Sequence, residues 1–321
     1  RALVRSRGLG DVYKRQVVTH SKLISEDGSL TVDPDSKLEE EIIVRPTSET
    51  IIWHMFKKWI TSYRDLPLKV NQWANVVRWE MRTRLFLRTS EFLWQEGHTA
   101  HATKEEAMEE TLQIVEIYRT LFEDYLAIPT MVGRKSNLER FAGADETFSI
   151  ETMMRDKKAL QAGTSHYLGT NFGNAFNVKF QSKDNKEHPV YATSWGVSTR
   201  MVGALIMVHG DDKGLKIPPK IAPIQVVIIP INPKDEKSKE FSSFVTNLEK
   251  KLSNLNIRTH VDQLDESPGF KFNKWELKGV PLRIEIGLKE LENLEVTLCR
   301  RDNSEKSVSY THLRAHETVL D

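Results

Sequence analysis

The chain contains a single cysteine, Cys299. One thiol excludes an intrachain disulfide and a zinc site built from clustered cysteines, so the fold must rest on packing alone. No stretch approaches the eighteen or more uncharged apolar residues of a membrane span, and the first residues lack the layout of a secretory signal. We therefore expect a cytoplasmic protein without a membrane partner.

Strong net charge and the common glycine-rich phosphate loops are also missing. The formal charge is +1, so a nucleic-acid partner would have to bind local basic patches such as residues 78–88. The sequence has no Gly-x4-Gly-Lys-Ser/Thr loop and no Gly-x-Gly-x-x-Gly after a strand, because Gly163, Gly169 and Gly173 are not spaced for either. Nucleotide binding by the folds that use these loops is disfavoured. Internal repeats and low-complexity tracts are absent.

The first 220 residues carry a mixture of helix and strand patterns. We expect amphipathic helices at 48–64 and from a capping box at 103–106 to Pro129. Three-to-four spacing predicts two buried stripes: Ile51, Ile52, Met55, Phe56, Trp59 and Ile60, then Met108, Leu112, Val115, Tyr118, Phe122 and Tyr125. Strand-like runs lie at 68–77, 148–153, 175–180 and 190–195. This irregular mixture favours an α+β domain.

Composition changes after the proline-rich segment 217–223. The pattern beyond it predicts strand 224–229, helix 237–255, strand 257–261, a turn at 268–269, helix 272–279 and strand 282–286. This β-α-β-α-β order indicates a second domain of α/β type with a central sheet.

Both ends differ from what they flank. Residues 1–16 and 309–321 lack the patterning of the neighbouring sequence, and we interpret them as non-native segments. Disordered native tails are the alternative.

Residues 76–80 (VVRWE) and 88–98 (RTSEFLWQEGH), joined by a short polar loop, are the most informative stretch. Two strands around a basic loop suit a nucleotide. Arg78 and Arg88 can direct guanidinium groups at phosphates, and Phe92 can offer a flat ring to a purine. Taken alone, the pattern is weak.

Further motifs strengthen the nucleotide-binding interpretation of residues 76–98. Together with SWGVSTR at 194–200, this stretch resembles motifs two and three of class II aminoacyl-tRNA synthetases. RPTSET at 45–50, FAG at 141–143 and QAGTSH at 161–166 resemble the prolyl-tRNA synthetase family of the archaeal and eukaryotic-like type. The resemblance covers roughly residues 17–306. It implies an antiparallel-sheet catalytic domain over 17–219 and an α/β anticodon-binding domain over 220–308.

The resemblance implies that proline is activated by ATP to prolyl-adenylate and passed to tRNA(Pro). It also implies Mg²⁺ with the ATP, and a homodimer in the full-length protein. A non-catalytic tRNA-binding or regulatory relative is the alternative. Because a binding module would have no use for a full set of ATP contacts, the enzyme is favoured, and pyrophosphate exchange would discriminate between the two.

Adenylate formation needs positive charge more than a base. The amino-acid carboxylate is already ionised at pH 7, and fixed cations must hold the phosphoryl oxygens. By resemblance Arg78 and Arg200 are the catalytic arginines, and Glu80 contacts magnesium or adenine. A strand-edge arginine and a core aromatic are the alternatives for Arg78 and Phe92. The implied ATP contacts are Arg78, Glu80, Arg88, Thr89, Phe92, Gln161, Ser198 and Arg200.

The resemblance implies a separate set for proline. Thr47 and Glu49 would receive the ring nitrogen, since a carboxylate suits a cationic secondary amine. Helix capping is the alternative for this pair, and a satisfied core histidine is the alternative for His98 or His166. The implied proline contacts are Thr47, Glu49, Arg78, Trp94, Glu96, His98, Phe141, Thr164 and His166. Without cysteine or a three-ligand histidine arrangement in this region, we expect no zinc.

The same resemblance implies truncation. Motif one is expected before Val17, and the rest of the anticodon domain with any zinc-binding extension after Lys306. We therefore expect an internal fragment that is inactive alone. The interval between Gly97 and Ser194 is too short for the large editing insertion of the bacterial prolyl type.

Overall fold

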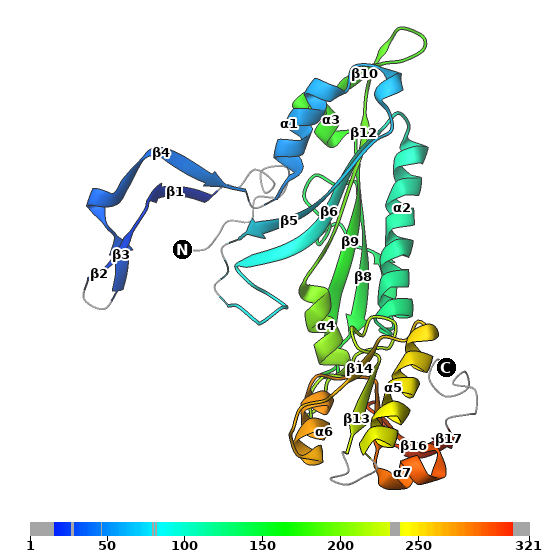
Figure 1. Cartoon of the computed structure of the whole chain (residues 1–321). Coiled ribbons are helices and arrows are strands. Elements are labelled where there is room, and N and C mark those ends of the chain that lie inside the picture. Colours follow the sequence, from blue (N-terminus) through cyan, green and yellow to red (C-terminus); the bar gives the residue numbers. More distant parts are fainter. Residues whose placement is uncertain are drawn as a thin grey trace. The chain divides into compact units, whose positions relative to one another are not determined.

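The computed structural model describes residues 16–26, 29–45, 47–78, 80, 82–231 and 238–310. It divides into two compact units (Figure 1). The first comprises the described residues up to Thr120, together with Thr130–Met153 and Lys157–Ala204. The second comprises Leu121–Pro129, Met154–Asp156 and the described residues from Leu205. Within the described ranges, no helix is long and apolar enough to cross a membrane.

A six-stranded antiparallel sheet organises the first unit, in the order β5-β6-β12-β9-β8-β7. Its strands are β5 (Leu68–Val77), β6 (Glu91–His101), β7 (Met131–Arg134), β8 (Glu146–Met153), β9 (Ala159–Gly169) and β12 (Tyr191–Ser198). Three two-stranded sheets pair β1 (Gln16–His20) with β4 (Lys37–Val44), β2 (Leu23–Glu26) with β3 (Ser29–Val32), and β10 (Lys179–Gln181) with β11 (Glu187–Pro189). The helices are α1 (Glu49–Trp59), α2 (Lys104–Thr120), α3 (Asn171–Phe176), the start of α4 (Arg200–His209), and short 3-10 turns at Pro34–Ser36 and Tyr63–Asp65.

The large sheet has two different faces. Helix α2 packs on one of them, as Figure 1 shows. Tyr118 of α2 donates its hydroxyl to Gln95 Oε1 at 2.7 Å, and Ser165 Oγ donates to the Thr111 carbonyl at 2.9 Å. Because side chains alternate along a strand, Gln95 and Gly97 of β6 and Gly163 and Ser165 of β9 face α2, whereas Glu96 and Thr164 face away from it. A β-bulge between Gln161 and Gly163 shifts the alternation, so this rule does not extend to Gln161.

A glycine allows close packing on the α2 face. Gly97 of β6 is paired with Trp195 of β12, and a Cβ at Gly97 would lie 2.1 Å from the Trp195 ring. No other residue fits there without moving the indole. At one end of the sheet, α1 and α3 close an apolar core around Trp53, Phe56 and Phe172.

The second unit contains a five-stranded mixed sheet, in the order β14-β13-β15-β16-β17. Its strands are β13 (Val226–Pro230), β14 (Thr259–Val261), β15 (Leu282–Ile286), β16 (Glu295–Arg300) and β17 (Lys306–Tyr310). Its helices are the π-helical turn Leu121–Tyr125, the end of α4, α5 (Ser238–Asn254), α6 (Pro268–Leu277) and α7 (Leu288–Asn293). Strands β14, β13 and β15 are paired in parallel, whereas the pairings of β15 with β16 and of β16 with β17 are antiparallel.

Strand β13 is buried on both faces. Val226 and Ile228 pack with Phe241 of α5, whereas Val227 and Ile229 pack with Trp275 of α6. Such burial explains the continuous apolar run that predicted this strand.

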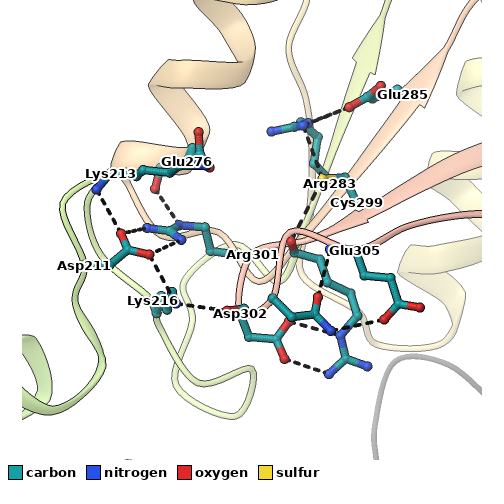
Figure 2. Close-up of polar contacts among 12 residues, drawn as sticks. Asp211, Lys213, Lys216, Glu276, Arg283, Glu285, Cys299, Arg301, Asp302 and Glu305 are labelled. Carbon is teal, nitrogen blue, oxygen red and sulfur yellow. Dashed lines mark hydrogen bonds and ion pairs between the residues drawn. The ribbon is translucent and has the colours of Figure 1, made fainter.

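Within the second unit, ion pairs connect the segment that follows α4 to the sheet strands and their turns (Figure 2). Arg301, which is 6% exposed, donates to both carboxylate oxygens of Asp211 at 2.6 and 3.0 Å. Lys216 lies 3.1 Å from the same carboxylate. These hydrogen bonds hold the pKa of Asp211 well below its usual range, with Arg301 the main cause and burial opposing it.

Several sequence expectations need correction. The first helix ends at Trp59 and not at Arg64. The Asp65 carboxylate accepts from the backbone amides of Thr61 and Ser62 at 2.9 and 2.8 Å, which favours a separate 3-10 turn over continued helix. The expected stripe is also wrong at Ile51 and Trp59, which are half exposed.

The stripe of the second helix also differs from the prediction. Leu112 and Tyr125 are exposed, and the small residues Ala107 and Thr111 are buried in their place. Small residues let α2 approach the sheet closely, which a pattern of large apolar residues does not reveal. The last turn changes to π geometry and so shifts the phase of Tyr125. The capping box is half formed: Thr103 Oγ1 accepts from the Glu106 amide, but the Glu106 carboxylate accepts from Ala102.

Two further segments were assigned the wrong local structure. Residues 175–180 were expected as a strand, but α3 extends to Phe176 and only Lys179–Gln181 is extended. The rings of Phe172 and Phe176, four residues apart, stack at 6.4 Å and favour the helix. Pro268 and Gly269 form the first turn of α6, because Ser267 caps the helix and proline suits its first position. Helix α7 and strands β16 and β17 were not predicted.

Candidate functional site

A cavity of about 280 Å³ lies in the first unit, on the sheet face opposite α2. Most of the predicted site residues line it: Thr47, Glu49, Arg78, Phe92, Trp94, Glu96, Phe141, Gln161, Thr164, His166, Ser198 and Arg200. Four predicted residues do not: Glu80, Arg88, Thr89 and His98. Lining residues that the sequence analysis did not assign to the site are Lys135, Glu139, Thr147, Ala162, Gly163, Ser194, Trp195 and Gly196.

Strand register places the floor of the cavity. Glu96 is paired with Gly196, and Gly196 with Thr164, so one row of the floor crosses three strands. In the next row Trp94 faces Ser198. The missing side chain at Gly196 leaves room above the sheet, because a Cβ there would lie 3.1 Å from the Trp94 ring.

Glu49 puts a carboxylate at the wall of the cavity although it is only 4% exposed. The Thr47 hydroxyl donates to its Oε2. Ser48, the residue at the N-cap position, makes no side-chain capping bond and instead accepts from Gln72 Nε2 at 3.2 Å. The Thr47 and Glu49 side chains therefore bond to each other, and the observed contacts do not favour the capping alternative.

A second buried carboxylate, Glu96, has polar partners on both oxygens. Its Oε2 lies 3.0 Å from His98 Nε2, and its Oε1 accepts from Gln72 Nε2. Burial raises the pKa of Glu96, but the bonds from His98, Ser48 and Gln72 outweigh it, and the net effect is a lowered pKa. Glu96 therefore stays ionised. His98 supports Glu96 from outside the cavity, which corrects its expected place in the pocket wall.

Arg78 directly follows β5, and its guanidinium lies over two aromatic rings. Its guanidinium carbon lies 5.2 Å from the Phe92 ring centroid and 5.8 Å from that of Trp94. The two rings meet edge to face at 5.8 Å. Its backbone amide donates to the Ser90 carbonyl at 2.7 Å, which fixes the base of the loop between β5 and β6. The guanidinium is thus held by stacking at the cavity wall.

Arg200 joins the loop and the sheet at the start of α4. Its Nε donates to the Leu87 carbonyl at 2.9 Å and its Nη1 to the Gln161 carbonyl at 3.3 Å. Burial lowers the pKa of Arg200, and the positive charges of Arg88 and Arg78 lower it further. Arg78 and Arg200 line the cavity, and Arg88, outside its lining, is close enough to act on Arg200; three guanidinium groups that repel one another form a site for a polyanion.

Two residues of the loop between β5 and β6 are paired with each other. Arg88 Nε donates to the Glu80 carboxylate, and Glu80 Oε1 also accepts from the Arg82 amide at 3.2 Å. Thr89 Oγ1 donates to the Glu91 carbonyl at 2.6 Å. Arg88 is 65% exposed, so its ion pair with Glu80 is weak and can exchange for a phosphate.

The wall opposite Arg78 is built around His166. Its ring packs on Phe141 with 4.7 Å between centroids, and its Nδ1 lies 3.0 Å from Thr147 Oγ1. Burial, followed by the charge of Lys135 and by His98, lowers the pKa of His166 to about 3, so the ring is neutral. Lys135 itself donates to the Gln161 amide oxygen.

Some of the unassigned lining residues could have been found from the sequence. Ser194 lies two and four residues before Gly196 and Ser198, so strand alternation places it on the same face. Its buried Oγ has no hydrogen-bond partner among the described residues. Lys135, Glu139 and Thr147 carry no comparable signal, since they come from a loop and from the start of β8. Among the described residues, no three His, Cys, Asp or Glu side chains lie close enough together to hold a metal ion.

Comparison with known proteins gives matches over both units. Residues 31–209 match the model of the tRNA synthetase class II core domain (G, H, P, S and T), and residues 225–316 match the model of the anticodon binding domain. The proline–tRNA ligase of Flavobacterium johnsoniae is 59% identical over 296 residues, which are 91% of this chain and 60% of that protein. The proline–tRNA ligase of Salinibacter ruber is 57% identical over 294 residues, with the same coverage.

A solved structure is also similar. The crystal structure of prolyl-tRNA synthetase from Cryptosporidium parvum complexed with L-proline and AMP matches with a TM-score of 0.82 and 46% identity. The match covers 86% of this chain and 57% of that one. The chain spans about 60% of the length of the curated relatives. An antiparallel core sheet, a cavity on its open face and a core model that matches more than half of the residues show that this chain belongs to the class II tRNA synthetase family.

Proposed function

We propose that the protein is a proline–tRNA ligase, which activates proline with ATP and transfers the prolyl group to tRNA(Pro). One observation carries the proposal: the same cavity is lined by a buried carboxylate, Glu49, and by the guanidinium groups of Arg78 and Arg200. A cationic amine fits the first and a triphosphate fits the second. The names of the similar ligases and the proline and AMP in the similar crystal structure agree with this chemistry.

Proline would bind between Glu49 and the aromatic wall. Its ring nitrogen carries two N–H bonds and a positive charge, and the Glu49 carboxylate with the Thr47 hydroxyl offers acceptors for both. Trp94, Phe141 and His166 would pack against the apolar ring carbons. Glu96 adds a second negative charge to the floor, alongside Thr164.

ATP would occupy the arginine end. Arg78 would contact both the proline carboxylate and the α-phosphate, since it lines the cavity within electrostatic reach of both Glu49 and Arg200. The carboxylate oxygen would attack the α-phosphorus, and the bond to the bridging oxygen would break as pyrophosphate leaves. Phe92 and Arg200 would hold adenine between them, with Arg88 on the outer phosphates. Gln161, Thr89 and Ser198 would make secondary ATP contacts.

Magnesium would enter with the nucleotide. Such ions are typically held by one or two carboxylates plus the substrate phosphates, and Glu80 beside Arg88 fits that role once Arg88 turns to a phosphate. The ion would supply positive charge on the phosphoryl oxygens.

We further propose that residues 17–219 form the catalytic part and residues 220–308 the anticodon-binding part, which recognises tRNA(Pro). The full-length protein would act as a cytoplasmic homodimer. A lining without cysteine points to proline selection by shape and charge, without a zinc ion.

Pyrophosphate exchange in the full-length protein tests the activity. Exchange should depend on proline, and Arg200→Ala should reduce it by at least about 100-fold, because a fixed cation on the phosphates is lost. Arg134→Ala is the matched control, since Arg134 is an exposed arginine outside the cavity. ATP binding without exchange would favour the non-catalytic alternative.

A further inference from the structure

Three residues of the cavity wall, Phe141, Thr147 and His166, contact one another in a triangle of two hydrogen bonds and one ring contact. Thr147, which is 1% exposed, accepts a hydrogen bond from the Phe141 backbone amide, with 3.1 Å between Oγ1 and N. The same Oγ1 lies 3.0 Å from His166 Nδ1. The Phe141 ring lies on the His166 ring and completes the triangle.

The order of donors in this triangle fixes the tautomer of His166. An amide N–H can only donate, so the Phe141 bond uses a lone pair of the Thr147 oxygen and leaves its proton free to donate. If Nδ1 carried a proton it would also donate to this oxygen, and the buried Thr147 hydroxyl proton would have no acceptor among the described residues, so Nδ1 is the acceptor of that proton. The surroundings keep the imidazole neutral, so the single ring proton must then reside on Nε2.

The tautomer decides what the cavity offers to a ligand. No described residue bonds His166 Nε2, and His166 lines the cavity. An unprotonated Nε2 would be an acceptor and would compete with Glu49 for a cationic amine. A protonated Nε2 is a donor, and Glu49 then remains the acceptor for that amine.

We propose that Thr147 is a positioning residue for amino-acid binding: its hydroxyl holds His166 as the Nε2–H tautomer and ties the Phe141 loop to the same wall. The assignment of proline as the ligand rests on the proposed function. The tautomer itself does not, because it follows from the protein's own hydrogen bonds.

Two variants separate the hydroxyl from the shape of the side chain. Thr147→Val keeps the shape and removes the hydroxyl, whereas Thr147→Ser keeps the hydroxyl. Thr152→Val is the matched control, since Thr152 is a buried threonine on the same strand that does not line the cavity. Nitrogen NMR of histidine-labelled full-length protein reads the tautomer, with the His166 signals assigned by their loss in His166→Gln. Calorimetry gives the proline dissociation constant.

We expect an unprotonated Nδ1 in the unmodified protein, in Thr147→Ser and in Thr152→Val. In Thr147→Val the tautomer should mix or invert, and the proline dissociation constant should rise about 5-fold, as expected for one lost hydrogen bond. A protonated Nδ1 in the unmodified protein would overturn the assignment. A protonated Nδ1 in Thr147→Ser, which keeps the hydroxyl, would overturn it as well. If the unmodified protein binds no proline, the proposed function fails, and the NMR result alone decides the role of Thr147.

Discussion

The guanidinium of Arg78 lies over the ring of Phe92, with 5.2 Å between the guanidinium carbon and the ring centroid. One face of the ring is thus in contact with a cation before any nucleotide binds. The edge of Trp94 closes another side. An adenine that stacks on Phe92 must use the remaining face or displace Arg78, so phosphate and base binding are coupled through this pair.

Replacing Phe92 should weaken ATP binding. Phe92→Ala in the full-length protein removes the stacking surface and the ring that steadies Arg78, at a cost of about 1 to 3 kcal/mol for a stacked base. The Michaelis constant for ATP in pyrophosphate exchange measures this loss. Leu93→Ala changes an exposed residue on the opposite side of the strand and should leave the constant unchanged. An unaltered ATP constant in folded Phe92→Ala would contradict the stacking role.

Neutralising Glu49 should affect proline far more than ATP. Glu49→Gln keeps the size of the side chain and loses the charge that pairs with the amine, and hydrogen bonds to charged groups are worth about 1.5 to 3 kcal/mol. Calorimetric titration with each ligand separates the two effects, and far-UV circular dichroism checks that α1 is intact. Equal loss of both affinities would point to a structural role instead.

The bonds to Glu96 should make stability depend on pH. Its folded-state pKa lies below the ordinary value of 4.5, so its contribution is fully present above that pH and is lost as pH falls through the folded pKa. Thermal melts of Glu96→Gln and the unmodified protein should therefore differ most near pH 7, and the difference should shrink progressively as the pH falls below 4.5. Glu91→Gln, an exposed carboxylate of the same strand, serves as the control. A difference in melting temperature that does not change with pH would rule out this linkage between the ionisation of Glu96 and stability.

Removing the charge of Asp211 should destabilise the second unit. Asp211→Asn leaves the buried guanidinium of Arg301 without its carboxylate, and we expect a loss of about 2 to 4 kcal/mol, since Asp211 itself is partly exposed. Asp302→Asn breaks an exposed pair with Arg300 in the same region and should cost less than about 1 kcal/mol. Urea unfolding of the two variants, followed by circular dichroism, compares the two losses. Equal losses would show that burial of the arginine is not the cause.

Proline selection should leave a detectable error. A small apolar pocket discriminates poorly against a smaller side chain, by about 10-fold to 200-fold for one methylene group. We expect measurable alanine-dependent pyrophosphate exchange, and hydrolysis of alanyl-tRNA at no more than the uncatalysed rate. Rapid hydrolysis of alanyl-tRNA by the protein would show an editing activity.

The sequence predicted the family and several of the strands, but it missed β7, β9, β16 and β17 and most helix ends. Strands at 68–77 and 282–286 are confirmed as β5 and β15, because alternating or continuous apolar runs specify them locally. The α+β core with a following α/β domain is confirmed as well. The end of α1 and the turn of α3 depended on particular contacts, the Asp65 carboxylate and the Phe172 and Phe176 rings, which no periodicity reveals.

The motifs identified most of the residues that line the cavity, but not the residues that hold those side chains in place. Glu49, Trp94 and Arg200 lie in runs that the resemblance identified, and the structure brings them to one cavity. Thr147 and Lys135 carry no motif, and their importance comes from distances across the sheet. His98 was expected at the wall, yet it acts through Glu96, since alternation fixes a face and not a depth.

The alternation of β12 has a consequence for how this gene can vary. The side chains of Ser194 and Ser198 and the bare Cα of Gly196 face the cavity. The Trp195 ring lies beside Gly97 on the α2 face, so Trp195 reaches the cavity lining from the other side of the strand, and Val197 shares that face. Substitution at any one of them alters one contact. Deletion of a single codon upstream within the strand would instead invert the whole segment, so that an indole enters the cavity and hydroxyls meet the helix. We expect length in this strand to be under stricter selection than residue identity.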